Sequence, residues 1–198
     1  MYTADQALSA PRRGQRALHA RQGALSDRGE GSARRAGEGQ RPYATIVGCS
    51  DSRVPPELLF DAGFGELFII RVAGNVISPE VMGTLQYAGV HLRTPLFVVL
   101  GHEGCGAVQA ALATMFHGVR ERSRIAHAPA RHRPRSEGRS APAATRQPVS
   151  NAAVEANVRW SMRQLLETPE VRARHAEGVM KLVGAVYELT TGRVRFLA

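Results

Sequence analysis

Three short runs of β-branched and aliphatic residues, each ending at a turn, limit the folds open to this chain. They are residues 43–48 (YATIVG), 66–72 (ELFIIRV) and 96–100 (LFVVL). Short continuous apolar runs of this kind are typical of parallel strands that are buried on both faces. Segments with helical composition follow the second and third runs, at 79–91 and 106–116. The sequence therefore predicts an α/β fold with a mainly parallel central sheet and helices on both faces.

The C-terminal part of the chain completes this pattern. Residues 151–167 carry apolar side chains at helical spacing. Residues 180–189 and 193–197 flank the turn Thr190-Thr191-Gly192, as in a β-hairpin. We therefore expect about four strands in the central sheet, with an antiparallel edge strand or C-terminal hairpin.

Two Arg-rich segments, 1–38 and 126–149, do not share this patterning. The formal net charge of the chain is +9, yet residues 42–119 hold three Arg against six acidic residues, so the excess lies elsewhere. We expect 1–38 to be a poorly ordered, atypical segment, and 39–198 to form a single domain that 126–149 interrupts. A solvated basic tail and loop is one interpretation, and translation of a GC-rich gene in a shifted reading frame is another.

Composition excludes several classes of protein. Two cysteines are too few for a disulfide scaffold or a four-thiolate zinc module. No apolar run approaches the ~20 residues that cross a bilayer, and residues 1–30 show no secretory signal, so we expect a cytoplasmic protein without membrane contact. Aromatic residues do not alternate with the arginines of 1–38, which argues against a nucleic-acid partner.

Candidate metal ligands follow two of the predicted strands. Cys49 comes directly after 43–48, and His102 and Cys105 come after 96–100. Function in open parallel sheets collects beyond the carboxyl ends of the strands. Two thiolates and an imidazole suit Zn²⁺, and three protein ligands leave open the fourth position that catalytic zinc requires. Two inert buried thiols and a hydrogen-bonded histidine are the structural alternative.

Asp51 and Arg53 lie two residues apart just past the first strand. A turn there lets Arg53 bind the carboxylate through two hydrogen bonds, which keeps Asp51 ionised and oriented beside the metal. An ordinary salt bridge in a turn, which contributes little, is the alternative. The spacing does not decide between them.

Three motifs carry a family resemblance. CSDSRV at 49–54, RVAGN at 71–75 and GHEGCGAV at 101–108 together resemble the β-class carbonic anhydrases. The resemblance covers residues 39–125 closely and 151–198 recognisably. It implies zinc-dependent, reversible hydration of CO₂ to bicarbonate and a proton, by attack of zinc-bound hydroxide.

The resemblance also implies roles for the residues around the metal. One Zn²⁺ per subunit is bound by Cys49, His102 and Cys105. Asp51 is either the fourth ligand of a closed site or, held by Arg53, the acceptor of a hydrogen bond from the hydroxide in an open site.

A substrate pocket and an assembly follow from the same resemblance. The family forms homodimers or higher homo-oligomers with the site at the subunit interface. Ile46 stands where the members regulated by bicarbonate carry Trp, so we do not expect that regulation. Residues matching contacts to CO₂ or bicarbonate are Gln40, Phe68, Ala73, Tyr87 and the backbone N–H of Gly106.

Two alternative functions stay open. A hydrolase of CS₂ or COS shares the zinc ligands and differs in access to the site. A zinc-binding remnant with impaired catalysis would result if the altered segments 1–38 and 126–149 prevent assembly.

Overall fold

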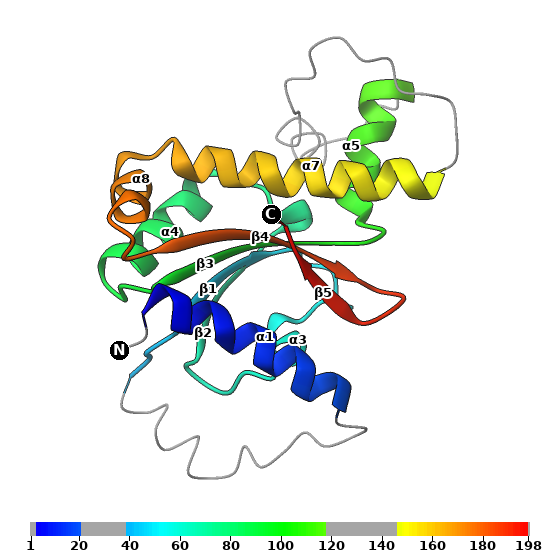
Figure 1. Ribbon diagram of the computed structural model, residues 1–198. Helices are drawn as coiled ribbons and strands as arrows, with labels where there is room; N and C mark the ends of the chain where they lie inside the picture. Colours follow the sequence, from blue (N-terminus) through cyan, green and yellow to red (C-terminus); the bar gives the residue numbers. More distant parts are fainter. Residues whose placement is uncertain (1–2, 21–38, 118–145, 198) are drawn as a thin grey trace.

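A five-stranded mixed sheet forms the centre of the molecule (Figure 1). The computed structural model describes residues 3–20, 39–117 and 146–197. The strand order is β2-β1-β3-β4-β5, with the first four strands parallel and β5 antiparallel to β4. This confirms the predicted α/β fold, mainly parallel sheet and antiparallel C-terminal hairpin. The strands are β1 (Ala44–Gly48), β2 (Leu67–Arg71), β3 (Leu96–His102), β4 (Lys181–Glu188) and β5 (Arg193–Phe196).

The register of the neighbouring interior strands β1 and β3 sets up the site. Every residue of β1 and of β3 is buried, as continuous apolar runs predict. Gly48 pairs with Leu100 of β3 on one side and with Arg71 of β2 on the other. The chain segments that follow Gly48 and Leu100 therefore emerge side by side at the carboxyl edge of the sheet.

Helices cover both faces of the sheet, as predicted (Figure 1). The long helix α7 (Arg146–Leu166) packs on β3 and β4, and α1 (Ala4–Ala20) lies on the opposite face. Glycines in the strands let α7 approach the sheet closely. A methyl group added at Gly101 of β3 would lie 2.7 Å from Cγ2 of Val158 on α7. The remaining helices are α3 (Pro56–Leu59), the 3₁₀ turn η1 (Ala73–Asn75), α4 (Pro79–Val90), α5 (Gly106–His117) and α8 (Pro169–Ala176).

The N-terminal segment differs from the prediction, because residues 4–20 form the helix α1 where we expected poor order. Thr3 and Gln6 form a reciprocal capping box, in which each side chain accepts a hydrogen bond from the other's backbone N–H at 3.0 and 3.2 Å. Ala4, Ala7 and Pro11 are buried. Their spacing is helical, but their side chains are too small to give the pattern of large apolar residues that we sought.

The second Arg-rich segment can be compared with the structure only at its end. Residues 118–145 lie outside the described residues, and α7 begins at Arg146. The assignment of 39–198 to one domain stays a prediction. In the ranges that the structure does describe, no helix combines the length and the apolar character needed to cross a membrane.

Candidate metal centre

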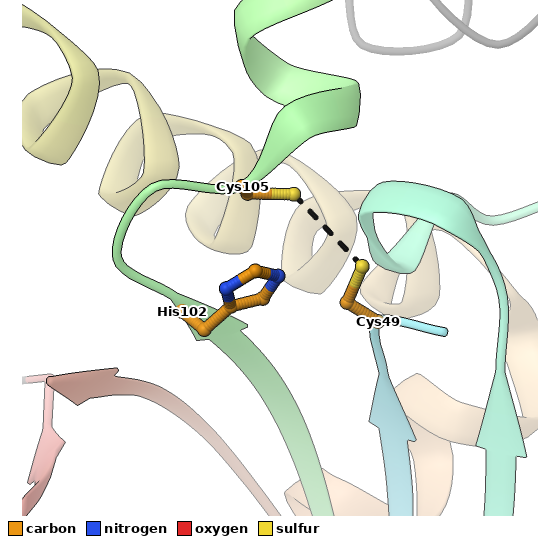
Figure 2. Close-up of side chains that lie close together, drawn as sticks. All are labelled: Cys49, His102 and Cys105. Carbon is orange, nitrogen blue, oxygen red and sulfur yellow. Dashed lines mark hydrogen bonds between the residues drawn. The ribbon is translucent and has the colours of Figure 1, made fainter. Parts of the chain in front are cut away.

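Cys49, His102 and Cys105 meet at the carboxyl edge of the sheet, where their side chains point toward one another (Figure 2). Cys49 follows β1, His102 is the last residue of β3, and Cys105 precedes the first turn of α5. The two sulfur atoms are 3.9 Å apart, and the three candidate ligand atoms lie within 4.8 Å of one another. All three residues are buried. The structure thus brings together the three side chains that the strand-end argument selected.

The orientation of His102 favours metal binding. Its Nδ1 lies 2.9 Å from the carbonyl oxygen of Glu103, so Nδ1–H donates and, in the neutral ring, the lone pair is on Nε2. Nε2 is buried and has no hydrogen-bond partner among the residues that the structure describes. An unpaired buried nitrogen is costly, and metal-binding histidines use the other ring nitrogen in this way. The imidazole therefore has the tautomer and position of a metal ligand.

The two neighbouring thiols have pKa values shifted in opposite directions. The hydrogen bond with Cys105 is the largest influence on Cys49, and together with contacts to His102 and Gly74 it outweighs burial and lowers the pKa of Cys49 to about 4. The neighbouring Cys49 sulfur, and then burial, raise the pKa of Cys105. Burial alone would lower the pKa of His102, but Cys49 raises it above its ordinary value. A bound cation would replace the remaining protons and stabilise both sulfurs as thiolates.

Asp51 and Arg53 form the pair that their spacing allowed. Arg53 Nε donates to Asp51 Oδ1 at 2.9 Å and Nη2 donates to Oδ2 at 2.7 Å, and the backbone N–H of Arg53 also donates to Oδ1. These hydrogen bonds hold the pKa of Asp51 well below its usual range. Asp51 Oδ2 lies 3.8 Å from His102 Nε2. The carboxylate is thus ionised and fixed beside the triad, although it is not a member of the group of clustered ligand atoms.

Two further residues shape the loop that carries Cys49. Arg71, at the end of β2, donates from Nε to the carbonyl oxygen of Cys49 at 2.9 Å and from Nη2 to that of Asp51. The backbone N–H of Gly74 donates to Cys49 Sγ at 3.3 Å. Sequence reasoning did not assign these contacts. The RVAGN motif at 71–75, whose glycine and asparagine follow a strand, was the signal available for them.

The five expected substrate residues divide into two groups. Ala73 lies in η1 next to Gly74, and Gly106 begins α5 directly after Cys105, so both lie in segments that border the triad. Phe68 pairs with Thr45 in the parallel register, four residues before Cys49, which corresponds to ~13 Å along the strand. The ring of Tyr87 contacts that of Phe68, with 6.0 Å between centroids. Phe68 and Tyr87 therefore do not lie beside the triad of their own chain.

Gln40 lies still farther from that triad. It precedes β1, and a methyl group added at Gly65 would lie 3.8 Å from its Cα. Gly65 comes just before β2, so this contact is at the amino edge of the sheet, whereas Cys49 is at the carboxyl edge. Within one chain, Gln40, Phe68 and Tyr87 thus lie apart from the triad that Ala73 and Gly106 border, and the role of all five in binding substrate stays a prediction.

Comparison with known proteins identifies the family. Two solved β-carbonic anhydrases share this fold. A tetrameric enzyme of Sordaria macrospora has a TM-score of 0.73 and 22% sequence identity, and the match covers 84% of this chain and 85% of that one. The Coccomyxa enzyme in complex with acetazolamide has a TM-score of 0.68 and 27% identity, and the match covers 89% of this chain and 87% of that one. The sequence model described as Carbonic anhydrase matches residues 44–194. This chain belongs to the β-class carbonic anhydrase family.

Relatives of known sequence agree with this assignment. Carbonic anhydrase 2 of Mycobacterium tuberculosis is 53% identical over 81 residues, which are 41% of this chain and 39% of that protein. The carbonic anhydrase of Pseudomonas aeruginosa is 35% identical over 163 residues, covering 78% of this chain and 73% of that one. The resemblance read from the three motifs is confirmed. The stretch of this chain that matches the mycobacterial relative spans 39% of that relative's length.

Proposed function

We propose that this protein is a zinc-dependent carbonic anhydrase that interconverts CO₂ and bicarbonate. The observation that supports it best is the cluster of two buried sulfurs and an unpaired imidazole nitrogen within 4.8 Å, with an arginine-held carboxylate beside it. Family membership and relatives named carbonic anhydrase agree with this chemistry. CO₂ and bicarbonate are accordingly the proposed partners. We also propose, from the sequence, that the protein is cytoplasmic.

Cys49, His102 and Cys105 would hold one zinc ion per subunit. The donor set fits, since zinc accepts thiolate sulfur and imidazole nitrogen, and three protein ligands leave a position for water. When bound, the ion acts as a Lewis acid that makes water a nucleophile near neutral pH.

Asp51 would orient the nucleophile. Its carboxylate is ionised and fixed by Arg53, so it can accept a hydrogen bond and thereby aim an oxygen lone pair at the carbon of CO₂. To act as a fourth metal ligand, Asp51 would have to give up bonds to Arg53. The observed pair therefore favours the open-site alternative. The backbone N–H of Gly106, at the first turn of α5, suits a partially negative substrate oxygen.

A second copy of the chain would complete the pocket. Phe68 and Tyr87 contact each other away from their own triad, and Tyr87 is 47% exposed. With Gln40 they would line the site of a partner subunit in a homodimer or larger homo-oligomer. The Sordaria macrospora enzyme, whose fold this chain shares, is described as tetrameric.

Stopped-flow measurement of CO₂ hydration on the purified full chain tests the proposal, with zinc content and mass in solution measured on the same sample. We expect stoichiometric zinc, an oligomer, and hydration far above the buffer rate. Stoichiometric zinc without hydration would instead indicate an impaired remnant. Sulfide release from CS₂ or COS without CO₂ hydration would indicate the related hydrolase.

A further inference from the structure

Three buried polar residues form a cluster behind the candidate metal centre. Asn157 and Ser161 lie one turn apart on α7, and Asn75 is the last residue of η1; their exposed fractions are 4%, 0% and 1%. Asn157 Nδ2 lies 3.4 Å from Asn75 Oδ1, and Asn75 Nδ2 lies 3.5 Å from Ser161 Oγ. Buried polar groups destabilise a protein unless they are paired, so a cluster in an otherwise apolar interface calls for a specific role.

The cluster holds the backbone of η1 in an unusual conformation. Gly74 and Asn75 both have positive φ angles, 68° and 46°. Two successive residues in the left-handed region are uncommon, and the second is not glycine, so the turn needs support from its surroundings. Asn157 Nδ2 donates to the carbonyl oxygen of Gly74 at 2.9 Å, and Ser161 Oγ donates to that of Asn75 at 3.1 Å. Helix α7 thus fixes both carbonyl groups of the turn.

The same turn contacts the metal centre. The backbone N–H of Gly74 donates to Cys49 Sγ at 3.3 Å. The φ and ψ angles at Gly74 set the direction of this N–H relative to the Gly74 carbonyl that Asn157 holds. We propose that Asn157, assisted by Ser161, is a positioning residue that holds the Gly74 turn so that its N–H donates to the Cys49 thiolate. This inference rests on the proposed zinc site and adds to it a residue from a different part of the chain.

The expected consequence concerns the sulfur rather than the reacting atoms. An N–H donor withdraws electron density from a thiolate and fixes its lone pairs. Groups that orient metal ligands from outside the coordination shell typically change metal affinity by about 10- to 100-fold when they are removed. Loss of the Gly74 hydrogen bond would let Cys49 leave the orientation that the metal needs, so metal binding should weaken by a factor in this range. In the protein that still binds metal, a sulfur without this N–H donor gives more charge to the metal.

Asn157→Leu tests this, since leucine is similar in size and cannot donate. Glu155→Leu is the control, because Glu155 is on the same helix and its side chain bonds to Arg195 of β5 instead. Zn²⁺ affinity of the full chain is measured by chelator competition, and Co²⁺-loaded protein is examined for its sulfur-to-cobalt charge-transfer band. For Asn157→Leu we expect about 10- to 100-fold weaker zinc binding and a band at lower energy, with Glu155→Leu unchanged.

Ser161→Ala is a smaller change that keeps the inference testable if Asn157→Leu fails to fold; it should shift the band in the same direction. A general loss of stability would not move the band of the folded, loaded protein. If the parent binds metal and both variants match it in affinity and band, the positioning role is wrong. A parent that binds neither Zn²⁺ nor Co²⁺ would overturn the proposed metal site and this inference with it.

Discussion

Asp51 receives three hydrogen bonds from Arg53, two from the guanidinium and one from the backbone, and its Oδ2 lies 3.8 Å from His102 Nε2. The side chain of Arg53 is 54% exposed, so as a surface salt bridge the pair would contribute little to stability. The pair instead fixes the orientation of the Asp51 side chain, because a carboxylate bound at both oxygens cannot rotate.

Removing the carboxylate should therefore affect rate and leave metal binding intact. We expect Asp51→Ala to retain zinc and to lower the rate of CO₂ hydration by about 100-fold or more, in the range of a positioned proton acceptor. Arg53→Lys should fall between the parent and Asp51→Ala, because lysine cannot form the bidentate contact. Stopped-flow rates at equal zinc content check this. Asp51→Ala with the parent's rate would remove Asp51 from the mechanism.

Removing a ligand should abolish metal binding. We expect Cys49→Ser and His102→Ala to lose zinc after dialysis, with zinc content measured by atomic absorption. His91→Ala is the control for loss of an imidazole, since His91 is exposed and contacts the ring of Tyr87. Full zinc retention in His102→Ala would show that the cluster is not the metal site.

Mixing two inactive variants can show whether Tyr87 acts on a partner's site. Cys49→Ser lacks the metal, and Tyr87→Ala lacks the proposed pocket wall. In a mixed dimer, the intact triad of the Tyr87→Ala chain would meet the intact Tyr87 of the other chain, so activity should return on mixing. Refolding the two variants together and measuring CO₂ hydration tests this. Activity that stays at the sum of the separate variants would place Tyr87 in its own chain's site or in none.

The close approach of α7 to the sheet predicts a position where a methyl group is not tolerated. A Cβ at Gly101 would lie 2.7 Å from Val158 Cγ2 and 2.9 Å from Val154 Cγ1. We expect Gly101→Ala to lower the free energy of unfolding by roughly 1–3 kcal/mol, as overpacking does. At Gly83, a Cβ would have no atom of another described segment within 4 Å, so Gly83→Ala should instead stabilise α4 by about 0.5–1 kcal/mol. Chemical denaturation measures both, and equal effects would contradict the packing described.

Local patterns in the sequence predicted much of this structure. The runs that became β1 and β3 were recognisable because a strand buried on both faces needs apolar side chains at successive positions. The run that became β2 has the same composition, although β2 is a mostly half-buried edge strand. Helix α1 was missed because alanines and a proline form its buried face, and small side chains give a weak periodic signal. The Thr3–Gln6 capping box was the sign of it in the sequence.

The sequence by itself determined which residues could bind the metal, because Cys49, His102 and Cys105 follow strands whose carboxyl ends share one edge of a parallel sheet. Only the tertiary structure decided which groups surround them. The Gly74 N–H meets the Cys49 sulfur because β1 pairs with β2. Asn157 lies behind that turn because of how α7 crosses the sheet, which no local pattern records. The same holds for Gln40 and Tyr87: the direction of β1 and the packing of α4 on β2 separate them from the triad of their own chain.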